Sequence, residues 1–228
     1  MKALIVADGD VPDRASLDVT WPGWADGAGI VIAADGGALG AEQLGLVIDL
    51  VVGDMDSLSP ERLAQLRGAG VEIELAPIAK DESDTELAVL AALARGAEAV
   101  TIVGAFGGAR LDHALANIGL LALPALAGCA VELLDASTRV TGLRAPDRAD
   151  RPVRQALHGR AGDLVSLLPL GSAVEGVTTE GLRYPLYEET LAAGPARGLS
   201  NVRVVPDAAV SVGRGFLVII ESPATLSP

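Results

Sequence analysis

The sequence predicts two domains of different class: an α/β domain with a doubly wound, mainly parallel sheet, then an all-β sandwich domain. Up to about residue 135, short apolar runs alternate with helical patterns, whereas from about residue 139 short strand-like runs follow one another. Charge divides in the same way, because residues 1–145 hold 9 Lys and Arg against 21 Asp and Glu, a net charge of −12. Residues 146–228 hold 8 against 9, a net charge of −1. We therefore expect domains at 1–145 and 146–228 with different tasks.

Six runs rich in Val, Ile and Leu predict the strands of the first domain, because strands buried on both faces of a parallel sheet are apolar almost throughout. They are 3–7, 29–34, 49–53, 71–75, 99–105 and 130–134. Helical patterns lie between them at 37–44, 60–67, 84–95 and 112–123, and each is followed directly by Gly or Pro. This alternation predicts a Rossmann-like sheet with helices on both faces.

Short runs with Gly and Pro between them predict the strands of the second domain, at 139–143, 163–168, 173–178, 201–205, 208–212 and 215–220. Strands at this even spacing are typical of a β-sandwich or a small barrel. The segment 144–155 is polar, rich in Arg and contains Pro. We expect it to be a linker or an exposed hairpin.

Composition excludes several classes of protein. The net charge of −13 argues against nucleic acid as a partner, because phosphate backbones are bound by a surplus of Lys and Arg. The single cysteine, Cys129, excludes a disulfide framework and a Cys-based zinc site. The longest uncharged apolar run, 118–131, contains Pro124 and falls short of the roughly 20 residues that span a bilayer. No signal peptide is visible, so we expect a soluble, cytoplasmic protein without a membrane partner.

Two clusters of polar residues follow the second and third expected strands. Asp35 ends the second strand and is followed by Gly36 and Gly37, which allow a sharp turn or the close approach of a ligand. Asp54 and Asp56 follow the third strand, and carboxylates two residues apart can share a hard cation. Each cluster is also compatible with an ordinary turn between a strand and a helix.

Two further clusters follow the fourth and fifth strands. Ser83 and Glu86 form a capping box, which explains them structurally but leaves Lys80, Asp81 and Asp84 at the same helix end unexplained. Lys80 is one of only two lysines, which favours a phosphate contact. In the fourth cluster, a glycine-rich loop leads to three polar residues at the start of a helix, Arg110, Asp112 and His113. Arg110 suits forked recognition of phosphate, whereas His113 is more typical of a surface or packing position.

The carboxyl ends of parallel strands meet at one edge of the sheet, where α/β proteins bind their ligands. The four clusters would therefore bring six carboxylates together beside two cationic side chains. So many negative charges repel one another unless cations bind among them. No GxxxxGK[ST] motif is present. The sequence thus predicts a site for Mg²⁺ and a polyphosphate without a P-loop.

The order of these motifs resembles the thiamin pyrophosphokinase family, which shows DGGAN, GDFDS, KDxTDxexA and GGRxDHxLANI. This chain has DGGAL, GDMDS, KDESDTELA and GGARLDHALANI in the same order, then VTTEGLRYPL and GLSN in the second domain. The resemblance covers about 35–220. The chain departs from the family pattern at four positions, Leu39, Met55, Ser83 and the additional Ala109.

The resemblance implies that the pyrophosphoryl group of ATP is transferred to the hydroxyl of thiamin, giving thiamin diphosphate and AMP. It implies catalytic roles for Asp35, Asp54, Asp56, Asp84 and Asp112, with Mg²⁺ held by Asp54, Asp56 and Asp84. Nucleotide contacts would come from Gly36, Gly37, Lys80, Asp81, Arg110 and His113. Ser200 and Asn201 would contact thiamin, which the family binds between the subunits of a homodimer.

Three other interpretations are compatible with parts of this pattern. A pyrophosphokinase for another alcohol, such as a hydroxymethyl pterin, would share the aspartates, but GLSN argues against it. A nucleotide-sensing module without turnover would need fewer carboxylates than this chain retains. A Mg²⁺-dependent phosphatase would need a nucleophile motif that the sequence lacks.

Overall fold

A computed structural model describes residues 1–145 and 151–224 of the chain. The chain divides into two compact units, Met1–Ala136 and Ser137–Pro228. The boundary expected at 145/146 falls later in the sequence, at the end of strand β7 (Arg139–Ala145).

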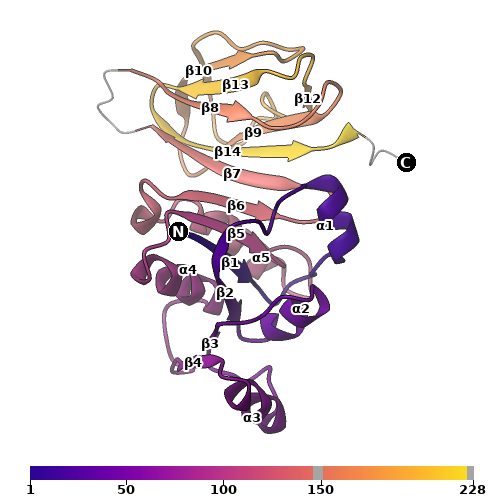
Figure 1. Ribbon diagram of the computed structural model, residues 1–228. Helices are drawn as coiled ribbons and strands as arrows, with labels where there is room; N and C mark the ends of the chain where they lie inside the picture. The colour runs from indigo at the N-terminus through magenta and orange to yellow at the C-terminus, as the bar shows by residue number, and fades with distance from the viewer. Residues whose placement is uncertain (146–150, 225–228) are drawn as a thin grey trace. The chain divides into compact units, whose positions relative to one another are not determined.

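The first unit contains a parallel sheet with the strand order β6-β5-β1-β2-β3-β4 (Figure 1). All six expected strands form, as β1 (Lys2–Val6), β2 (Ala28–Ala34), β3 (Leu50–Gly53), β4 (Glu72–Leu75), β5 (Ala99–Val103) and β6 (Ala130–Leu134). Strands β2 to β4 lie on one side of β1, and β5 and β6 lie on the other. The strand order therefore reverses at β1, and this switch point is where doubly wound sheets open a crevice for ligands.

The four expected helices form as α2 (Gly37–Gln43), α3 (Pro60–Gly68), α4 (Asp84–Ala94) and α5 (Leu111–Leu120), and a 3₁₀ turn follows at Pro124–Leu126. Ser59 caps α3 and Ser83 caps α4. The hydroxyl of each serine accepts a hydrogen bond from the backbone N–H of the residue three positions later. A further helix, α1 (Arg14–Thr20), was not predicted. It buries only Leu17, so its apolar pattern is too short to show helical periodicity.

Alternation along the strands separates two packed faces. Leu4 and Val6 of β1 belong to one apolar core together with residues of α1, α2 and α3. Ile5 is also fully buried and points the other way, because successive side chains of a strand alternate. Helix α4 packs against β1, β2 and β3, and Figure 1 shows it on the side of the sheet opposite α2. The doubly wound arrangement is confirmed.

The second unit is an antiparallel sandwich of two sheets, ordered β12-β9-β14-β7 and β11-β10-β13-β8. After β7, its strands are β8 (Val153–Leu157), β9 (Leu164–Pro169), β10 (Val174–Glu180), β11 (Glu189–Leu191), β12 (Asn201–Val202), β13 (Ala208–Val212) and β14 (Gly215–Ser222). Both sheets contribute to one apolar core, which includes Leu167 and Leu217 from one and Val177 and Val210 from the other.

Three details of the second unit differ from the prediction. Strand β8 occupies part of the segment 144–155 that was expected to be a linker or hairpin, and its alternating burial explains why polar residues occur in it. Residues 146–150 of that segment lie outside the described residues. Strand β11 was not predicted, and β12 covers only the first two residues of the run at 201–205.

A charged pair lies inside the second unit. The side chains of Arg203 and Glu221 are 1% and 3% exposed, and Nη2 of the arginine lies 3.3 Å from Oε1 of the glutamate. Arg203 also donates to the backbone carbonyls of Gly159 and Pro206, at 3.2 and 2.8 Å. The backbone N–H of His158 donates to the same glutamate oxygen at 2.6 Å. One arginine thus connects three separate segments of the sandwich.

Across the two described ranges, no helix has the length and apolar character needed to cross a membrane.

Candidate active site

A pocket of about 710 Å³ opens at the carboxyl ends of the parallel strands in the first unit. Its walls come from the segments that follow β1, β2, β3, β4 and β5, which is where the sequence predicted a site. Eight of the expected residues line it: Asp35, Asp54, Asp56, Lys80, Asp81, Asp84, Arg110 and His113. Residues far apart in the sequence therefore converge on one cavity.

Three carboxylates form the centre of the pocket. Asp35, Asp54 and Asp84 each place a carboxylate oxygen so that all three oxygens lie within 4.8 Å of one another. They come from three different segments, after β2, after β3 and at the start of α4. Convergent carboxylate oxygens at this spacing are the donor set that a hard divalent cation prefers. No ion is needed to explain the fold, but the three charges call for a counter-charge.

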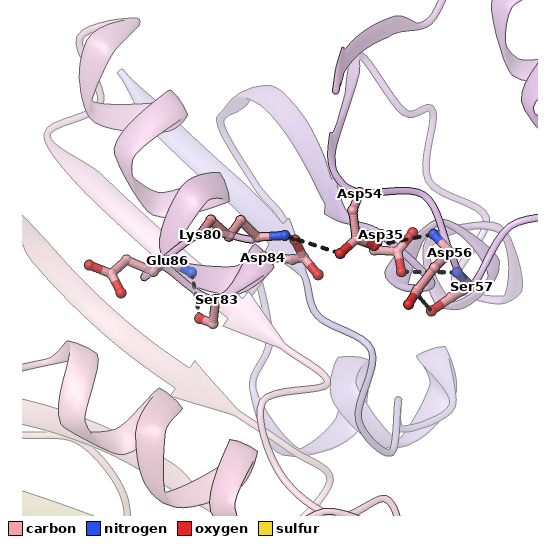
Figure 2. A network of polar contacts seen from close by, with 8 residues as sticks. All are labelled: Asp35, Asp54, Asp56, Ser57, Lys80, Ser83, Asp84 and Glu86. Atoms are coloured by element: carbon pink, nitrogen blue, oxygen red, sulfur yellow. Dashed lines mark hydrogen bonds and ion pairs between the residues drawn. The ribbon is translucent and has the colours of Figure 1, made fainter. Parts of the chain in front are cut away.

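Lys80 supplies part of that counter-charge. Its Nζ lies 3.3 Å from Oδ2 of Asp54 and 3.0 Å from Oδ1 of Asp84, and Figure 2 shows the ammonium group next to these two carboxylates. Burial alone would lower the pKa of Lys80, but pairing with Asp84 and Asp54 raises it, so the ammonium stays charged. Hydrogen bonds from the Asp56 backbone and from Lys80 likewise outweigh burial and lower the pKa of Asp54.

Asp35 is the most buried of the three carboxylates, with 4% of its surface exposed. Burial raises its pKa, partly opposed by hydrogen bonds from Ser57, and the negative charge of Asp84 raises it further. Oδ2 of Asp35 accepts a hydrogen bond from the Ser57 backbone at 3.2 Å. Among the described residues, Oδ1 of Asp35 has no hydrogen-bond partner. A buried acceptor without a partner is costly, and a bound cation would satisfy it.

The backbone around the triad adopts unusual conformations. Asp35 has φ 44°, Met55 has φ 64° and Gly53 has φ 150°. Left-handed conformations at Asp35 and Met55 are uncommon for residues other than Gly, and such strain is often found at functional sites. The side chain of Met55 is buried in the core of the first unit, which holds the strained loop in place. These unusual conformations thus lie at and beside two of the three triad residues.

Gly53 is expected to be required for the geometry of the triad. A Cβ atom at this position would lie 3.0 Å from Cβ of Asp35 and 3.1 Å from Cγ of Asp84, at a φ that only Gly adopts readily. We expect Gly53→Ala to lower the stability of the first unit by about 1–3 kcal/mol and to reduce turnover strongly. Thermal unfolding and a product assay measure both effects.

Gly68→Ala is the matched control for that prediction. Gly68 is the last residue of α3, and a Cβ there would meet nothing within 4 Å. We expect this variant to retain activity and to gain up to about 1 kcal/mol, because Ala restricts the unfolded chain more than Gly. Equal behaviour of the two variants would contradict the role given to Gly53.

Asp56 and Asp81 line the pocket without belonging to the triad. The Asp56 backbone N–H donates to Oδ1 of Asp54 at 3.3 Å, and its carboxylate accepts from the Ser57 hydroxyl at 3.2 Å. Asp81 is exposed at the start of the segment that leads into α4. The convergent set thus contains Asp35, where Asp56 was expected beside Asp54 and Asp84.

Arg110 and Asp112 form an exposed pair at the rim. Nε of Arg110 donates to Oδ1 of Asp112 at 2.9 Å, and Nη2 donates to Oδ2 at 2.6 Å. Hydrogen bonds from Arg110 lower the pKa of Asp112 to about 2. Arg110 and His113 line the pocket, whereas Asp112 does not. In this state Asp112 acts on the guanidinium of Arg110 and not on the cavity.

Gly36 and Gly37 do not line the pocket. A Cβ at Gly36 would collide with the carboxylate of Asp8, and one at Gly37 would collide with the backbone carbonyl of Val6. These glycines let the start of α2 approach the end of β1 closely. Gly36 thereby leaves room for the carboxylate of Asp8, which lines the pocket.

Asp8 lines the pocket and was not predicted. It follows β1, the strand at the switch point, so its position two residues after that strand was the signal that pointed to it. Partial burial, and then the negative charges of Asp56 and Asp84, raise the pKa of Asp8, while His113 opposes this. The pocket therefore holds one carboxylate that the sequence pattern did not predict.

The two residues expected to contact thiamin lie in the second unit. Ser200 is exposed and has φ 55°, and its backbone N–H donates to the Ser166 hydroxyl at 3.0 Å. Asn201 is buried, and its amide accepts from the backbone N–H of Tyr184 at 3.0 Å and donates to the Tyr184 carbonyl at 2.7 Å. Asn201 therefore holds the segment of Tyr184 in place, and the exposed Ser200 hydroxyl is available to a ligand.

Fold and site together define a two-domain protein, an α/β unit and an antiparallel β unit, with a pocket suited to a divalent cation and a polyanionic ligand. Residues 23–133 match the thiamin pyrophosphokinase catalytic domain, and residues 153–217 match the thiamin pyrophosphokinase vitamin B1 binding domain. The chain belongs to the thiamin pyrophosphokinase family.

Individual relatives agree with this assignment. The chain is 26% identical over 218 residues to a thiamine pyrophosphokinase of Bacillus subtilis, covering 96% of this chain and 97% of the relative. The crystal structure of thiamine pyrophosphokinase from Bacillus subtilis superposes with a TM-score of 0.82 at 24% identity, covering 98% and 99% of the two chains. A thiamin pyrophosphokinase family protein from Enterococcus faecalis gives a TM-score of 0.79 at 28% identity, covering 97% and 99%.

Proposed function

We propose that this chain transfers the pyrophosphoryl group of ATP to the hydroxyl of thiamin. The thiamin oxygen forms a bond to the β-phosphorus, the bond from that phosphorus to the oxygen shared with the α-phosphorus breaks, and AMP leaves. The hydroxyl proton is released. The observation that carries the proposal is the convergence of Asp35, Asp54 and Asp84 in a unit that matches the family's catalytic domain.

Mg²⁺ is the cofactor that fits these residues. Asp35, Asp54 and Asp84 offer only oxygen ligands, and Oδ1 of Asp35 is a buried acceptor without a partner among the described residues. When bound there, Mg²⁺ would offset the negative charge of the phosphate oxygens. Asp56 was also expected to be a Mg²⁺ ligand, and this role stays a prediction. In the structure its backbone N–H donates to Asp54, and its carboxylate accepts from the Ser57 hydroxyl.

Lys80 and Arg110 are the cationic side chains that we assign to the phosphates. Lys80 has three N–H donors, and its ion pairs with Asp54 and Asp84 fix its position at the centre of the pocket. Arg110 is held by Asp112 and would exchange that carboxylate for a phosphate, since its forked donors suit either partner. Positioning and charge neutralisation are what phosphoryl transfer requires of a protein.

Thiamin is the acceptor that we assign on the match of the second unit to the vitamin B1 binding domain. Ser200 is exposed there, and so are two aromatic side chains, Tyr184 at 56% and Tyr187 at 73%. An exposed ring can stack on the cationic thiazolium of thiamin. We further propose a homodimer that binds thiamin between its subunits, and a cytoplasmic location, where ATP is available; both stay predictions.

One assay tests the proposed function. The protein is incubated with ATP and Mg²⁺, with and without thiamin, and AMP is followed. We expect AMP to form only when thiamin is present, and a hydroxymethyl pterin in its place to give none. ADP or inorganic phosphate as the sole product would contradict the proposal, as would ATP binding without any turnover.

A further inference from the structure

Ile78 differs from every other residue of the catalytic pocket. It lies in the segment between β4 and α4, lines the pocket, and is 82% exposed. Among the residues that line the cavity in the described part of the chain, the other apolar side chains are alanines: Ala34, Ala105, Ala109 and Ala114. The remaining walls are charged, polar or glycine. One large aliphatic side chain therefore stands at an otherwise polar cavity.

The position of Ile78 is held from both sides. Two residues before it, the backbone N–H of Ala76 donates to the carbonyl of Gly53 at 2.8 Å, which ties the segment to the end of β3. Two residues after it, Lys80 is paired with Asp54 and Asp84. Pro77 also restricts the backbone directly before Ile78. The backbone that carries Ile78 is thus held at both ends of a short segment, and its side chain lines the same pocket as the triad.

We propose that Ile78 forms the subsite for the nucleobase of ATP, an inference that rests on the proposed ATP site. A nucleoside triphosphate carries a flat, uncharged ring on the same molecule as its phosphates. With the phosphates at the triad and Lys80, the base needs an apolar surface close by, and Ile78 is the surface that the pocket offers. Covering this exposed side chain with the ring removes apolar area from water, which is favourable.

Thiamin is the other ring-bearing substrate, and the chemistry of Ile78 does not favour it. The rings of thiamin include a cation, which is bound best by aromatic faces or carboxylates and gains little from an aliphatic side chain. The match to the vitamin B1 binding domain also lies in residues 153–217, outside the unit that contains Ile78. An aliphatic contact responds to the face of a base and not to its hydrogen-bonding edge. ATP and GTP should therefore depend on Ile78 to a similar extent.

The test compares the affinity for ATP with that for inorganic tripolyphosphate, which has the phosphates but no base. Both are titrated calorimetrically into the full chain with Mg²⁺ and without thiamin. We expect Ile78→Ala to weaken ATP about 5- to 10-fold, from the apolar surface one isoleucine covers, and to leave tripolyphosphate unchanged. Ile78→Leu should restore the ATP affinity.

Leu75→Ala is the matched control. Leu75 lies three residues earlier, is 70% exposed and does not line the pocket, so its removal should leave both affinities unchanged. Unchanged ATP affinity in Ile78→Ala would overturn the subsite, and so would an equal loss for ATP and tripolyphosphate. A rise in KM for thiamin with unchanged ATP affinity would also overturn it.

The titration and the product assay together separate this inference from the proposed function. If the unchanged chain bound ATP in the titration but formed no AMP in the assay with thiamin, the proposed function would be wrong, while the effect of Ile78→Ala on ATP affinity would still decide the subsite. If the unchanged chain bound no ATP, both would be wrong.

Discussion

Replacing Asp35 by Asn is expected to lower kcat/KM about 100- to 1000-fold while the fold stays intact. The carboxylate of Asp35 belongs to the triad. Its loss removes one of the three negative charges that we assign to the binding of Mg²⁺, which in turn would offset the charge of the phosphates. Asn keeps the shape of the side chain and tolerates the left-handed backbone of this residue, φ 44°. The loss of activity therefore reports on charge.

Stability gives this variant a second readout. The pKa of Asp35 is raised in the folded state, so folding favours its protonated form and the ionised form lowers stability near neutral pH. We expect Asp35→Asn to unfold at the same or a higher temperature than the unchanged chain without Mg²⁺. Added Mg²⁺ should raise the unfolding temperature of the unchanged chain and have little effect on the variant.

Asp56→Asn is the comparison that identifies the ligand set. Asp56 lines the same pocket, but its carboxylate is bonded to the Ser57 hydroxyl and lies outside the group of three. We expect it to retain more activity than Asp35→Asn and to keep the stabilisation by Mg²⁺. The opposite order would contradict the triad and support the set of Asp54, Asp56 and Asp84.

Replacing Arg203 by Met is expected to destabilise the second unit by about 3–5 kcal/mol. The change removes the ion pair of a buried glutamate and leaves its negative charge less well compensated inside the sandwich. It also removes the donors to Gly159 and Pro206. Equilibrium unfolding in urea, monitored by the β-sheet signal in circular dichroism, measures the lost stability. A loss below about 1 kcal/mol would contradict this prediction.

The pH dependence of that loss has a definite sign. Burial raises the pKa of Glu221, Asp163 adds to this, and Arg139 and Arg203 oppose it. Without Arg203 the pKa rises further, so protonation relieves the buried charge at a higher pH. The stability deficit of Arg203→Met should therefore shrink as the pH falls through the folded pKa of Glu221.

Two further variants complete the comparison. Arg203→Met combined with Glu221→Leu should regain much of the lost stability, because the buried carboxylate is removed together with its partner. Arg154→Met removes the exposed pair with Glu180, whose side chains are 54% and 55% exposed, and should cost less than about 1 kcal/mol. Similar losses for Arg154→Met and Arg203→Met would show that burial of the pair is unimportant.

Much of the fold followed from local patterns. The six strands of the first unit were predicted because each is an apolar run. The four helices were predicted from helical patterns that end at Gly or Pro, and Ser59 and Ser83 do cap two of them. Helix α1 was not predicted, because its one buried residue, Leu17, makes no periodic pattern. Strand β8 was not predicted, because its exposed face carries polar residues that are also typical of a loop.

The site was predictable in its place but not in its detail. The ends of the predicted strands indicated where the pocket lies. The choice of the three aspartates that converge depends on backbone conformations such as those of Asp35 and Met55, which residue propensities do not reveal. Asn201 was expected to bind a ligand, but its amide is hydrogen-bonded to the backbone of Tyr184, seventeen positions away in the sequence. Such long-range partners are set by the tertiary fold.

The position of bond cleavage in ATP is the most direct test of the proposed function. ³¹P NMR of the protein with ATP, Mg²⁺ and thiamin resolves every phosphorus-containing product in one sample. We expect AMP and thiamin diphosphate to appear in equal amounts, with neither ADP nor inorganic phosphate. ADP together with thiamin monophosphate would show attack at the γ-phosphorus and would contradict the proposed transfer of the pyrophosphoryl group.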